Sequence, residues 1–423
     1  MTSVSRRDFT RLLALTGATP LLGRVPETWI SAALPATPEE PDEKFWAEVR
    51  ARFLLPADLV FLNAANLCPT SMPVVEALEA NSRYLDANPS SASRARLTEG
   101  REESRRHVAA SLGVTPEEIV ITRNTSEANN LVSNGLQLGA GDEVVVFADN
   151  HPSNLNAWRE KAKRFGFAAV EVPVVTPHPG AEAYIGGFTA AMTRKTRLLA
   201  ITHVTNTMGD MLPVAELCRA ARSRGILSLV DGAQSFGALN VNLGELQPDF
   251  YSGSAHKWPC GPKETGVLFI HRAVHERMHP SIVSLYPGAV GISRSMEGYG
   301  QRDEPALAAL GTAIKFQNDI GRAVIEGRVR QLAQRLATEL VKIEGVSLWT
   351  NPSPATSAGI VVFKPATLDP RRLVTALYET ERIACAASGG TTRPGVRFSP
   401  HFYNTMAEID RTVSAVRRHI MAA

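Results

Sequence analysis

Two residues that could do chemistry together, an aspartate and a lysine, lie in the second half of the chain. Asp231 directly follows the apolar run 226–230, and Lys257 lies in the Ser/Gly-rich segment 252–258. The carboxyl ends of strands in an α/β sheet are where ligands bind. A lysine amine can form a Schiff base with an aldehyde, and a carboxylate can keep a ring nitrogen protonated. Considered alone, the two residues would more often form a buried structural ion pair.

Polar residues also follow three other runs that predict strands. Thr125 and Ser126 open a predicted helix, and the free N–H groups and dipole of a helix start bind phosphate. His151 could stack on a flat ring, and Asn206 follows a further strand. Each signal is weak alone, because hydroxyls at a helix start usually just cap the helix. Together, groups for an aldehyde, a ring and a phosphate at neighbouring strand ends favour pyridoxal phosphate as the cofactor.

The elements that must position these residues alternate along the chain. Strands that alternate with helices of about 10–15 residues predict βαβ units and a mostly parallel sheet with helices on both faces. The runs that predict strands are 60–62, 118–121, 143–147, 168–172, 198–201, 226–230 and 266–270. A helical stretch from about 305 to 343 follows, with breaks expected at Gly311, Gly321 and Gly327. The strand 359–363 and the helix 371–380 after it predict a smaller C-terminal α+β domain.

The composition excludes several classes of protein. With 423 residues, 44% hydrophobic and 21% charged, the chain can fold into two or three domains and is not disordered. It has no apolar run long enough to span a membrane, so no membrane is expected for the mature form. A net charge of +3 is too small to indicate nucleic acid as a partner. Its four scattered cysteines predict neither a disulfide framework nor a metal site.

The first residues have the pattern of an export signal. Arg6 and Arg7 precede the short apolar run 12–15, and the small residues 31–33 follow. Paired arginines of this kind indicate the twin-arginine route, and hence a periplasmic protein. An amphipathic first helix with a chance Arg-Arg pair is the alternative. The predicted division of the chain is 1–36 signal peptide, 37–70 linker and segment packing on the small domain, 71–305 large cofactor-binding domain, and 306–423 small domain.

Several segments, taken together, resemble a known family. They are 125–129 (TSEAN), 203–209 (HVTNTMG), 231–235 (DGAQS), 254–258 (SAHKW) and Arg397 ahead of Tyr403. They resemble the class V aminotransferases, fold-type I pyridoxal-phosphate enzymes, and are closest to the isopenicillin N epimerase-like and cysteine desulfurase-like branch. The resemblance implies an α/β fold with a mainly parallel seven-stranded sheet flanked by helices, plus a smaller C-terminal α+β domain.

The resemblance also implies roles for individual residues. Lys257 would bind the aldehyde and move the α-proton, Asp231 would pair with the pyridine nitrogen, and His151 would stack on the ring. Gln234 would reach the ring oxygen. The phosphate would be held by Thr125, Ser126, Ser254 and His256. The substrate carboxylate would be bound by Arg397, Asn206 and Asn66, with Asn206 also near the cofactor. Such enzymes are typically homodimers with shared active sites. Gln301 departs from the family pattern, because relatives often carry a threonine there that contacts the partner subunit's phosphate, and Gln301 would have to serve in its place.

Two departures from the family pattern bear on the reaction. Glu264 stands where a glycine is usual. No cysteine lies on the loop just ahead of Arg397, where a desulfurase needs a thiolate. Cys385 and Cys260 are predicted to be small buried residues. The expected protein is an exported pyridoxal-phosphate enzyme that acts on the α-amino group of an amino acid, free or in a peptide.

The type of reaction stays open at this point. Epimerisation, transamination, decarboxylation and β-elimination all fit the motifs. A cysteine desulfurase or C–S lyase using Cys385 or Cys260 is one alternative. A protein that binds the cofactor or an amine without turnover is another, although such a protein would not need to keep Lys257, Asp231 and Arg397.

Overall fold

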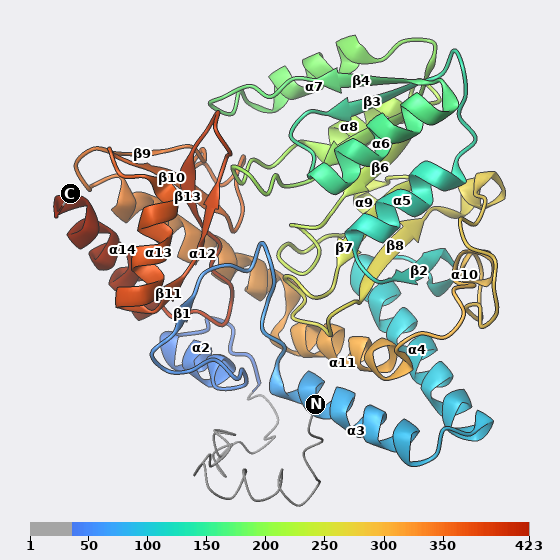
Figure 1. Ribbon diagram of the computed structural model, residues 1–423, viewed down its shortest axis with the longest axis horizontal. Helices are drawn as coiled ribbons and strands as arrows, with labels where there is room; N and C mark the ends of the chain where they lie inside the picture. The colour runs from blue at the N-terminus through green and yellow to red at the C-terminus, as the bar shows by residue number, and fades with distance from the viewer. Residues whose placement is uncertain (1–35, 423) are drawn as a thin grey trace, which may run out of the picture. The chain divides into compact units, whose positions relative to one another are not determined.

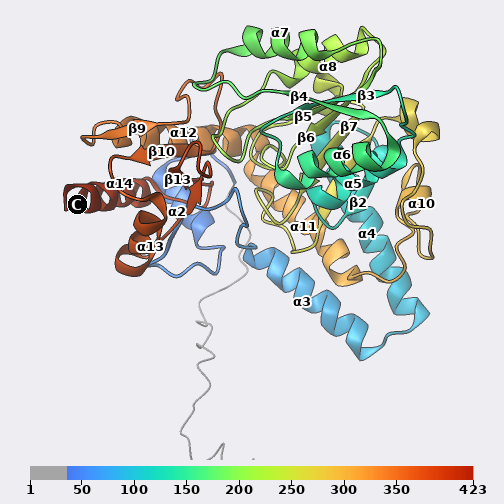
Figure 2. The same cartoon turned by 45° about the horizontal axis from the view of Figure 1, so that its top comes forward.

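The structure is a computed structural model that describes residues 36–422. A seven-stranded sheet with the helices that cover it makes up the larger part (Figures 1 and 2). In spatial order its strands are β2 (Ile119–Thr122), β8 (Gly266–Ile270), β7 (Phe250–Ser254), β6 (Leu227–Asp231), β5 (Thr196–Thr202), β3 (Glu143–Phe147) and β4 (Ala168–Val172). From β7 to β4 all neighbours are parallel. Only β8 runs antiparallel to both of its neighbours.

Successive residues of a strand point to opposite sides of the sheet. Because residues on both sides are apolar here, helices cover both faces. In β3, Val144 and Val146 enter one apolar cluster, with side chains of α5 (Thr125–Gly135) and α6 (Pro152–Phe165). Val145 and Phe147 enter the cluster on the other face, with α4 (Ser91–Leu112), α7 (Ala181–Ala191), α8 (Val214–Arg222) and α11 (Glu304–Ile320). This two-sided burial explains why the strand was readable as a continuous apolar run.

The strand register determines where the chemistry lies. Thr202 at the end of β5 pairs with Asp231 at the end of β6, and Asp231 pairs with Ser252 in β7. The carboxyl ends of the three parallel strands therefore align at one edge of the sheet. The segments that follow them carry Asn206, Gln234 and Lys257.

A second, antiparallel sheet lies beside the first one in both views (Figures 1 and 2). Its order is β12 (Ala386–Ser388), β13 (Gly395–Phe398), β10 (Val361–Pro365) and β9 (Val346–Leu348). It shares an apolar cluster with α12 (Arg322–Leu340), α13 (Pro370–Glu381) and α14 (Met406–Met421). The short strand β1 (Val60–Phe61) pairs in parallel with β11 (Ile383–Ala384). This pair connects the N-terminal segment to the C-terminal part of the chain.

The remaining helical elements connect these parts. They are α2 (Glu43–Arg50), α3 (Met72–Ala87), η1 (Pro116–Glu118), α9 (Leu243–Leu246), η2 (Arg272–Arg277) and α10 (Ser293–Met296). Helix α11 packs along both α3 and α4. The predicted fold class, a mainly parallel seven-stranded sheet with helices on both faces and a smaller α+β part, is confirmed.

Some elements differ from the sequence-based expectation. The long helical stretch breaks only at Gly321, whose φ of 101° ends α11, whereas Gly311 and Gly327 lie inside α11 and α12. The expected breaks at those two glycines were wrong. Helix α4 was not predicted, because its buried face includes Arg101 and Arg105 and so lacks an apolar stripe.

Other expectations concern parts that the structure does not test. The described residues belong to one unit by their contacts, so the domain boundaries at 70 and 305 stay predictions. The export signal lies outside residues 36–422. Within that range, none of the helices has the length and apolar character that a membrane span needs.

Candidate active site

The Asp231 carboxylate lies at the end of β6 and is 2% exposed. Its Oδ2 accepts hydrogen bonds from the Nδ2 atoms of Asn129 at 2.8 Å and Asn154 at 3.3 Å. Its Oδ1 accepts one from the Ala233 backbone N–H at 3.1 Å. No lysine or arginine of residues 36–422 forms an ion pair with it. Neutral N–H groups therefore hold a carboxylate that would suit a protonated ring nitrogen, and the alternative of an Asp231–Lys257 ion pair is wrong.

Lys257 lies on the loop after β7. The turn is closed by hydrogen bonds from the Cys260 N–H to the Lys257 carbonyl, 2.9 Å, and from the Gly261 N–H to the Ala255 carbonyl, 2.7 Å. Burial lowers the pKa of the Lys257 amine, the positive charge of Arg397 lowers it further, and Asp231 opposes both. A lowered pKa increases the share of neutral amine, which is the form that attacks an aldehyde or takes a proton.

The start of α5 faces the end of β7 and forms a cup suited to phosphate. The Thr125 N–H donates to Ser254 Oγ at 2.9 Å, and the two hydroxyls lie 2.8 Å apart. Gly266 permits this approach, because a Cβ there would lie 2.8 Å from the Asn124 Cα. The free N–H groups of the first helical turn, which includes Ser126, then point toward a bound anion.

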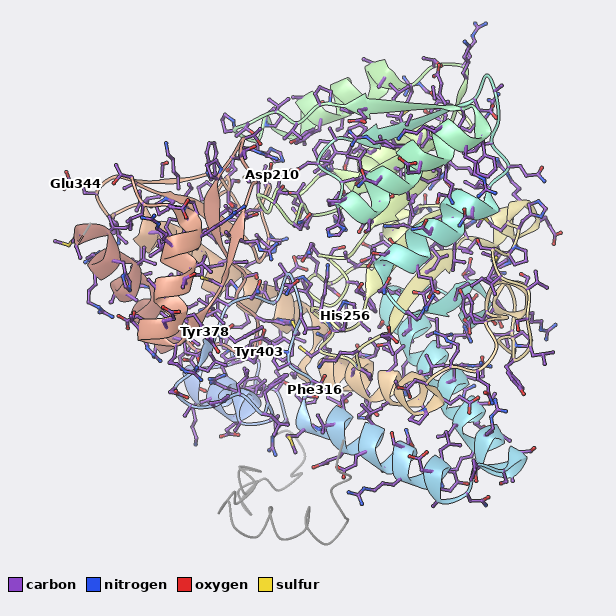
Figure 3. The ribbon with its side chains drawn as sticks, viewed as in Figure 1. Asp210, His256, Phe316, Glu344, Tyr378 and Tyr403 are labelled. Carbon is purple, nitrogen blue, oxygen red and sulfur yellow. The ribbon has the colours of Figure 1, made fainter. Side chains whose placement is uncertain are left out.

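His256 lies between the elements of the two sheets (Figure 3). Burial lowers the pKa of its ring to about 4, and the charges of Lys257 and Lys263 act in the same direction. A neutral imidazole can donate one hydrogen bond to a phosphate oxygen but carries no charge.

His151 precedes α6 and is exposed in this structure. Its Nδ1 accepts from the Ser153 N–H at 3.2 Å, so the proton of the neutral ring is on Nε2. Desolvation by the surrounding protein lowers the pKa of His151, as do the charges of Lys257 and Arg397, while Asp231 opposes them. These interactions place the imidazole near the lysine and the aspartate.

Arg397 on β13 is the buried cation of the site. It is 8% exposed, and it donates to the Asn206 carbonyl at 2.8 Å and to Asn63 Oδ1 at 3.2 Å. Its Nε has no partner, and no carboxylate of the described chain pairs with it. Burial lowers the pKa of this guanidinium to about 10. A buried guanidinium with an unused donor fits a substrate carboxylate.

Two other interpretations of this region are a structural ion pair between Arg397 and Glu408, and Arg393 as the carboxylate anchor. Glu408 pairs with Arg50 at 2.9 Å, so it does not neutralise Arg397. Arg393 pairs with Asp149 at 3.1 Å, which favours Arg397 as the anchor.

For the other predicted site residues, Gln234, Asn206, Asn66 and Gln301, the hydrogen bonds and exposure give weaker support for a role. The Gln234 amide donates to the Ala65 carbonyl at 2.9 Å and accepts from the Trp258 indole at 2.8 Å, which leaves one N–H for a ring oxygen. Asn206 is half-buried and meets Arg397 through its backbone. Asn66 and Gln301 are exposed, and neither side chain has a hydrogen bond to another described residue.

Sequence reasoning gave no role to the residues behind Asp231. Asn129 was quoted only as part of a motif, and Asn154 and Ser252 were not singled out. The spacing of Asn129 could have predicted its position, because it lies four residues after Thr125 and therefore on the same face of α5. The contribution of α6 depends on helix packing, which the sequence does not show.

Cys218, Cys260 and Cys385 do not have the properties of a reactive thiolate, although Cys385 is half-buried and not fully buried as predicted. Burial raises the pKa of the Cys218 and Cys385 thiols to about 12. Burial also raises the pKa of Cys260 well above its ordinary value, and the neighbouring Cys68 adds to this. Low thiol pKa values mark nucleophilic cysteines, and these values are high.

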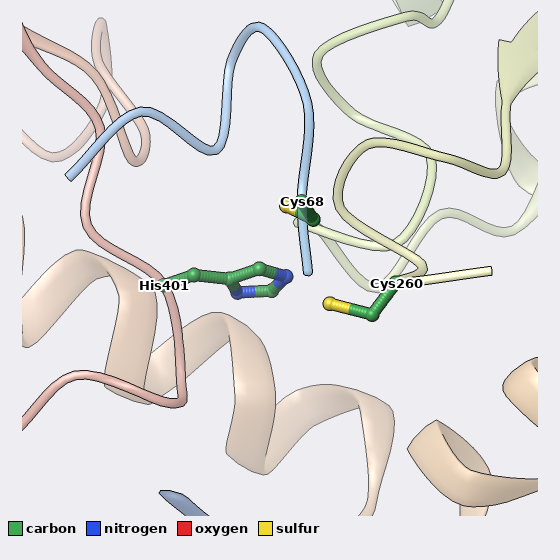
Figure 4. A group of neighbouring side chains, drawn as sticks. All are labelled: Cys68, Cys260 and His401. Atoms are coloured by element: carbon green, nitrogen blue, oxygen red, sulfur yellow. The ribbon is translucent and has the colours of Figure 1, made fainter. Parts of the chain in front are cut away.

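Cys68, Cys260 and His401 lie close together (Figure 4), and Cys260 belongs to the loop that carries Lys257. All are buried, and their possible metal-binding atoms lie within 4.8 Å of one another. The His401 Nε2 is 2.6 Å from the Trp258 carbonyl, which can only accept a hydrogen bond. That nitrogen therefore carries the proton, and the ring supports the lysine loop instead of offering a lone pair there.

Comparisons with known proteins agree with this geometry. A sequence profile described as "Aminotransferase class-V" matches residues 60–412. An isopenicillin N epimerase of Streptomyces clavuligerus is 32% identical over 88% of this chain and 97% of its own length. A probable cysteine desulfurase of Methanothermobacter thermautotrophicus is 31% identical over 86% and 95%.

Solved structures show the same fold. A mutant of C-DES with glycine covalently linked to the PLP cofactor has a TM-score of 0.81 and 25% identity, covering 89% of this chain and 99% of that one. The cysteine desulfurase CsdA from Escherichia coli has a TM-score of 0.79 and 26% identity, covering 89% and 98%.

Proposed function

The chain belongs to the class V aminotransferases, which are pyridoxal-phosphate enzymes, and on this premise we propose that it inverts the α-carbon of an amino acid, free or at the end of a peptide. The single observation that carries the proposal is the buried Arg397, which has no carboxylate partner in the described chain and lies near Lys257. An arginine fork in a desolvated site selects a carboxylate, and the amine beside it can take the neighbouring α-proton.

The residues of the site fit the cofactor and divide the work among them. Pyridoxal phosphate, when bound, supplies a ring that accepts the electrons left at the α-carbon. Lys257 would hold the aldehyde and take the α-proton from one face, and its lowered pKa favours the neutral amine. A proton delivered to the opposite face of the α-carbon would complete the inversion. Arg397 fixes the substrate carboxylate and so determines which bond at the α-carbon faces the lysine. Thr125 and Ser254 would hold the phosphate, and Asp231 would pair with the ring nitrogen.

Sulfur release from cysteine is the second candidate, since the cysteine desulfurases named above are as similar to this chain as the epimerase is. A desulfurase needs a thiolate that attacks sulfur. Burial raises the pKa of Cys385 to about 12, and the loop 388–394 has no cysteine. These features favour inversion over sulfur transfer.

The deciding experiment uses the purified, cofactor-loaded protein in D₂O with a panel of amino acids and short peptides. Inversion incorporates deuterium at the α-carbon and yields the mirror-image centre, measured by mass spectrometry and chiral chromatography. Lys257→Ala should abolish both, and borohydride should attach the cofactor to the Lys257 peptide in the unmodified chain. Deuterium incorporation without inversion, or fast sulfide release that Cys385→Ser abolishes, would overturn the proposal.

A homodimer is part of the proposal. The segment after β8 exposes Ile282, Val283, Leu285 and Tyr286, at 43%, 86%, 69% and 44%. The Leu285 carbonyl accepts from the Gly300 N–H at 3.1 Å, so this apolar patch adjoins Gln301. A second copy of the chain on the patch would bury it and bring Gln301 toward the partner's phosphate cup.

We also propose export to the periplasm by the twin-arginine route, supported by Arg6 and Arg7 ahead of a short apolar run. Replacing both arginines with lysine should leave a folded, yellow protein in the cytoplasm. Fractionation of cells followed by absorbance and immunoblotting measures this. Arrival of the doubly substituted protein in the periplasm would contradict the route.

A further inference from the structure

The hydrogen bonds around Asp231 are unevenly distributed between its two oxygens. Oδ2 accepts from both Asn129 and Asn154, whereas the Ala233 backbone N–H is the only donor to Oδ1 among residues 36–422. Each carboxylate oxygen has about two acceptor positions. Oδ2 is therefore saturated, and Oδ1 keeps one position for a further donor.

Ser252 behind Asn129 fixes the direction of that amide. The Ser252 hydroxyl donates to Asn129 Oδ1 at 2.7 Å, and Asn129 Nδ2 then donates to Asp231 at 2.8 Å. A flipped amide would place its oxygen against the carboxylate oxygen. All three side chains are 0–2% exposed, so water does not replace a lost partner. The chain Ser252–Asn129–Asp231 joins β7, α5 and β6.

Asn154 reaches the same oxygen from α6. Its Nδ2 lies 3.3 Å from Asp231 Oδ2, and its Oδ1 is buried without a partner. A buried amide oxygen without a partner costs free energy, so the hydrogen bond to Asp231 is the one polar interaction of this side chain with the described residues that offsets its burial.

We propose that Asn129, oriented by Ser252, and Asn154 are positioning residues for the cofactor. Because they saturate Oδ2, the free acceptor position on Oδ1 is the one left for the ring nitrogen. Both amides are neutral donors, so they hold the carboxylate without neutralising it, whereas a lysine or arginine would compete with the ring nitrogen for its charge. The ring nitrogen then keeps its proton and the ring its electron-accepting strength. This inference requires pyridoxal phosphate as the cofactor and does not depend on which reaction follows.

Three variants test the inference. Asn129→Leu removes the donor while keeping the same branched arrangement of heavy atoms, and Ser252→Ala removes only the hydroxyl that orients it. Asn130→Leu is the matched control: it is the next residue of α5, and its amide donates to a carbonyl of its own helix, Ser126 O, at 2.9 Å. Circular dichroism and thermal melting show that each variant folds.

The measurements do not require a substrate. We expect cofactor to dissociate about 10–100-fold faster from Asn129→Leu and about tenfold faster from Ser252→Ala, with a shifted pH titration of the bound cofactor's absorbance. Asn130→Leu should match the parent protein. Reconstitution with 1-deazapyridoxal phosphate, which has carbon in place of the ring nitrogen, should make all variants alike.

The outcomes separate this inference from the proposed function. If Asn129→Leu and Asn130→Leu lose pyridoxal phosphate at the same rate and have the same absorbance titration, the inference is overturned. A defect of Asn129→Leu that persists undiminished with the deaza cofactor would show a purely structural role and overturn it too. A shifted absorbance titration in a protein that inverts no amino acid would support the inference while the proposed reaction failed.

Discussion

Two arginines lie four positions apart near β13, and their partners give them different roles. Arg393 faces the Asp149 carboxylate at 3.1 Å, whereas Arg397 has only neutral oxygen partners and a buried, unused Nε. A positive charge buried without an anion raises the free energy of the free protein. A substrate carboxylate removes that penalty on binding, so the second arginine is the one prepared for a ligand.

Substituting Arg397 should therefore cost transition-state binding. Arg397→Lys keeps a charge but loses the planar fork, so it should reduce kcat/KM nearly as much as Arg397→Ala, by about 2–5 kcal/mol. Arg393→Gln is the comparison, and cofactor should stay bound in all three. Steady-state kinetics on an established substrate measure the effect. Collapse of activity in Arg393→Gln alone would transfer the role to that residue.

Asp210 gives a prediction of pH dependence. Burial, together with the nearby Asp149, raises the pKa of Asp210 to about 7, against the opposing charge of Arg393. Between about pH 4 and 7 the unfolded chain loses this proton while the folded protein keeps it. The stability contributed by the protonated group is thus complete below pH 4 and is lost as the pH rises to about 7.

Asp210→Asn removes this titration. The free energy of unfolding of the variant minus that of the parent protein should increase by roughly 2–4 kcal/mol as the pH rises from 4 to 7. Above pH 7 this difference should change little. Urea unfolding of both proteins at several pH values provides the difference. A difference that is independent of pH would show that Asp210 is ionised throughout.

At the scale of the element, the sequence predicted what depends on local pattern. The bounds of β3, β4 and β8 match the predicted runs. β3 and β8 are apolar on both faces apart from Glu143, whereas β4 keeps Ala168 and Glu171 exposed. The alignment of strand ends that assembles Asp231 and Lys257 was also predictable. Helix α4 and the amide donors to Asp231 were not, since buried arginines mask an apolar stripe and inter-helix contacts leave no periodic signal.

The glycines of α11 and α12 test how one residue ends a helix. Gly321 has φ 101°, a conformation that L residues rarely adopt, whereas Gly327 is helical with open space around its Cβ position. Gly321→Ala should lower the free energy of unfolding by about 1–2 kcal/mol, and Gly327→Ala should raise it by about 0.5–1 kcal/mol. Urea denaturation measures both. Equal effects would mean that the helix break is set by packing instead.

At the scale of the whole molecule, the exposed apolar segment 282–286 predicts an assembly. Val283→Asp combined with Leu285→Asp should convert a dimer into a monomer and weaken cofactor retention, because Gln301 would no longer reach the partner. Val341→Asp, at a residue 50% exposed on the end of α12, is the control. Analytical ultracentrifugation gives the mass. A dimer that survives the double substitution places the interface elsewhere.

The antiparallel strand β8 has a consequence for biosynthesis. Strand β2, at residues 119–122, pairs only with β8, at residues 266–270, and α5 follows β2 after two residues. During synthesis at about 5–20 residues per second, the helix with the phosphate-binding start emerges on the order of ten seconds before the strand that seats it. The short pair β1–β11 closes later still. We therefore expect capture of the cofactor to be one of the last events in making this protein, after the sheet has formed.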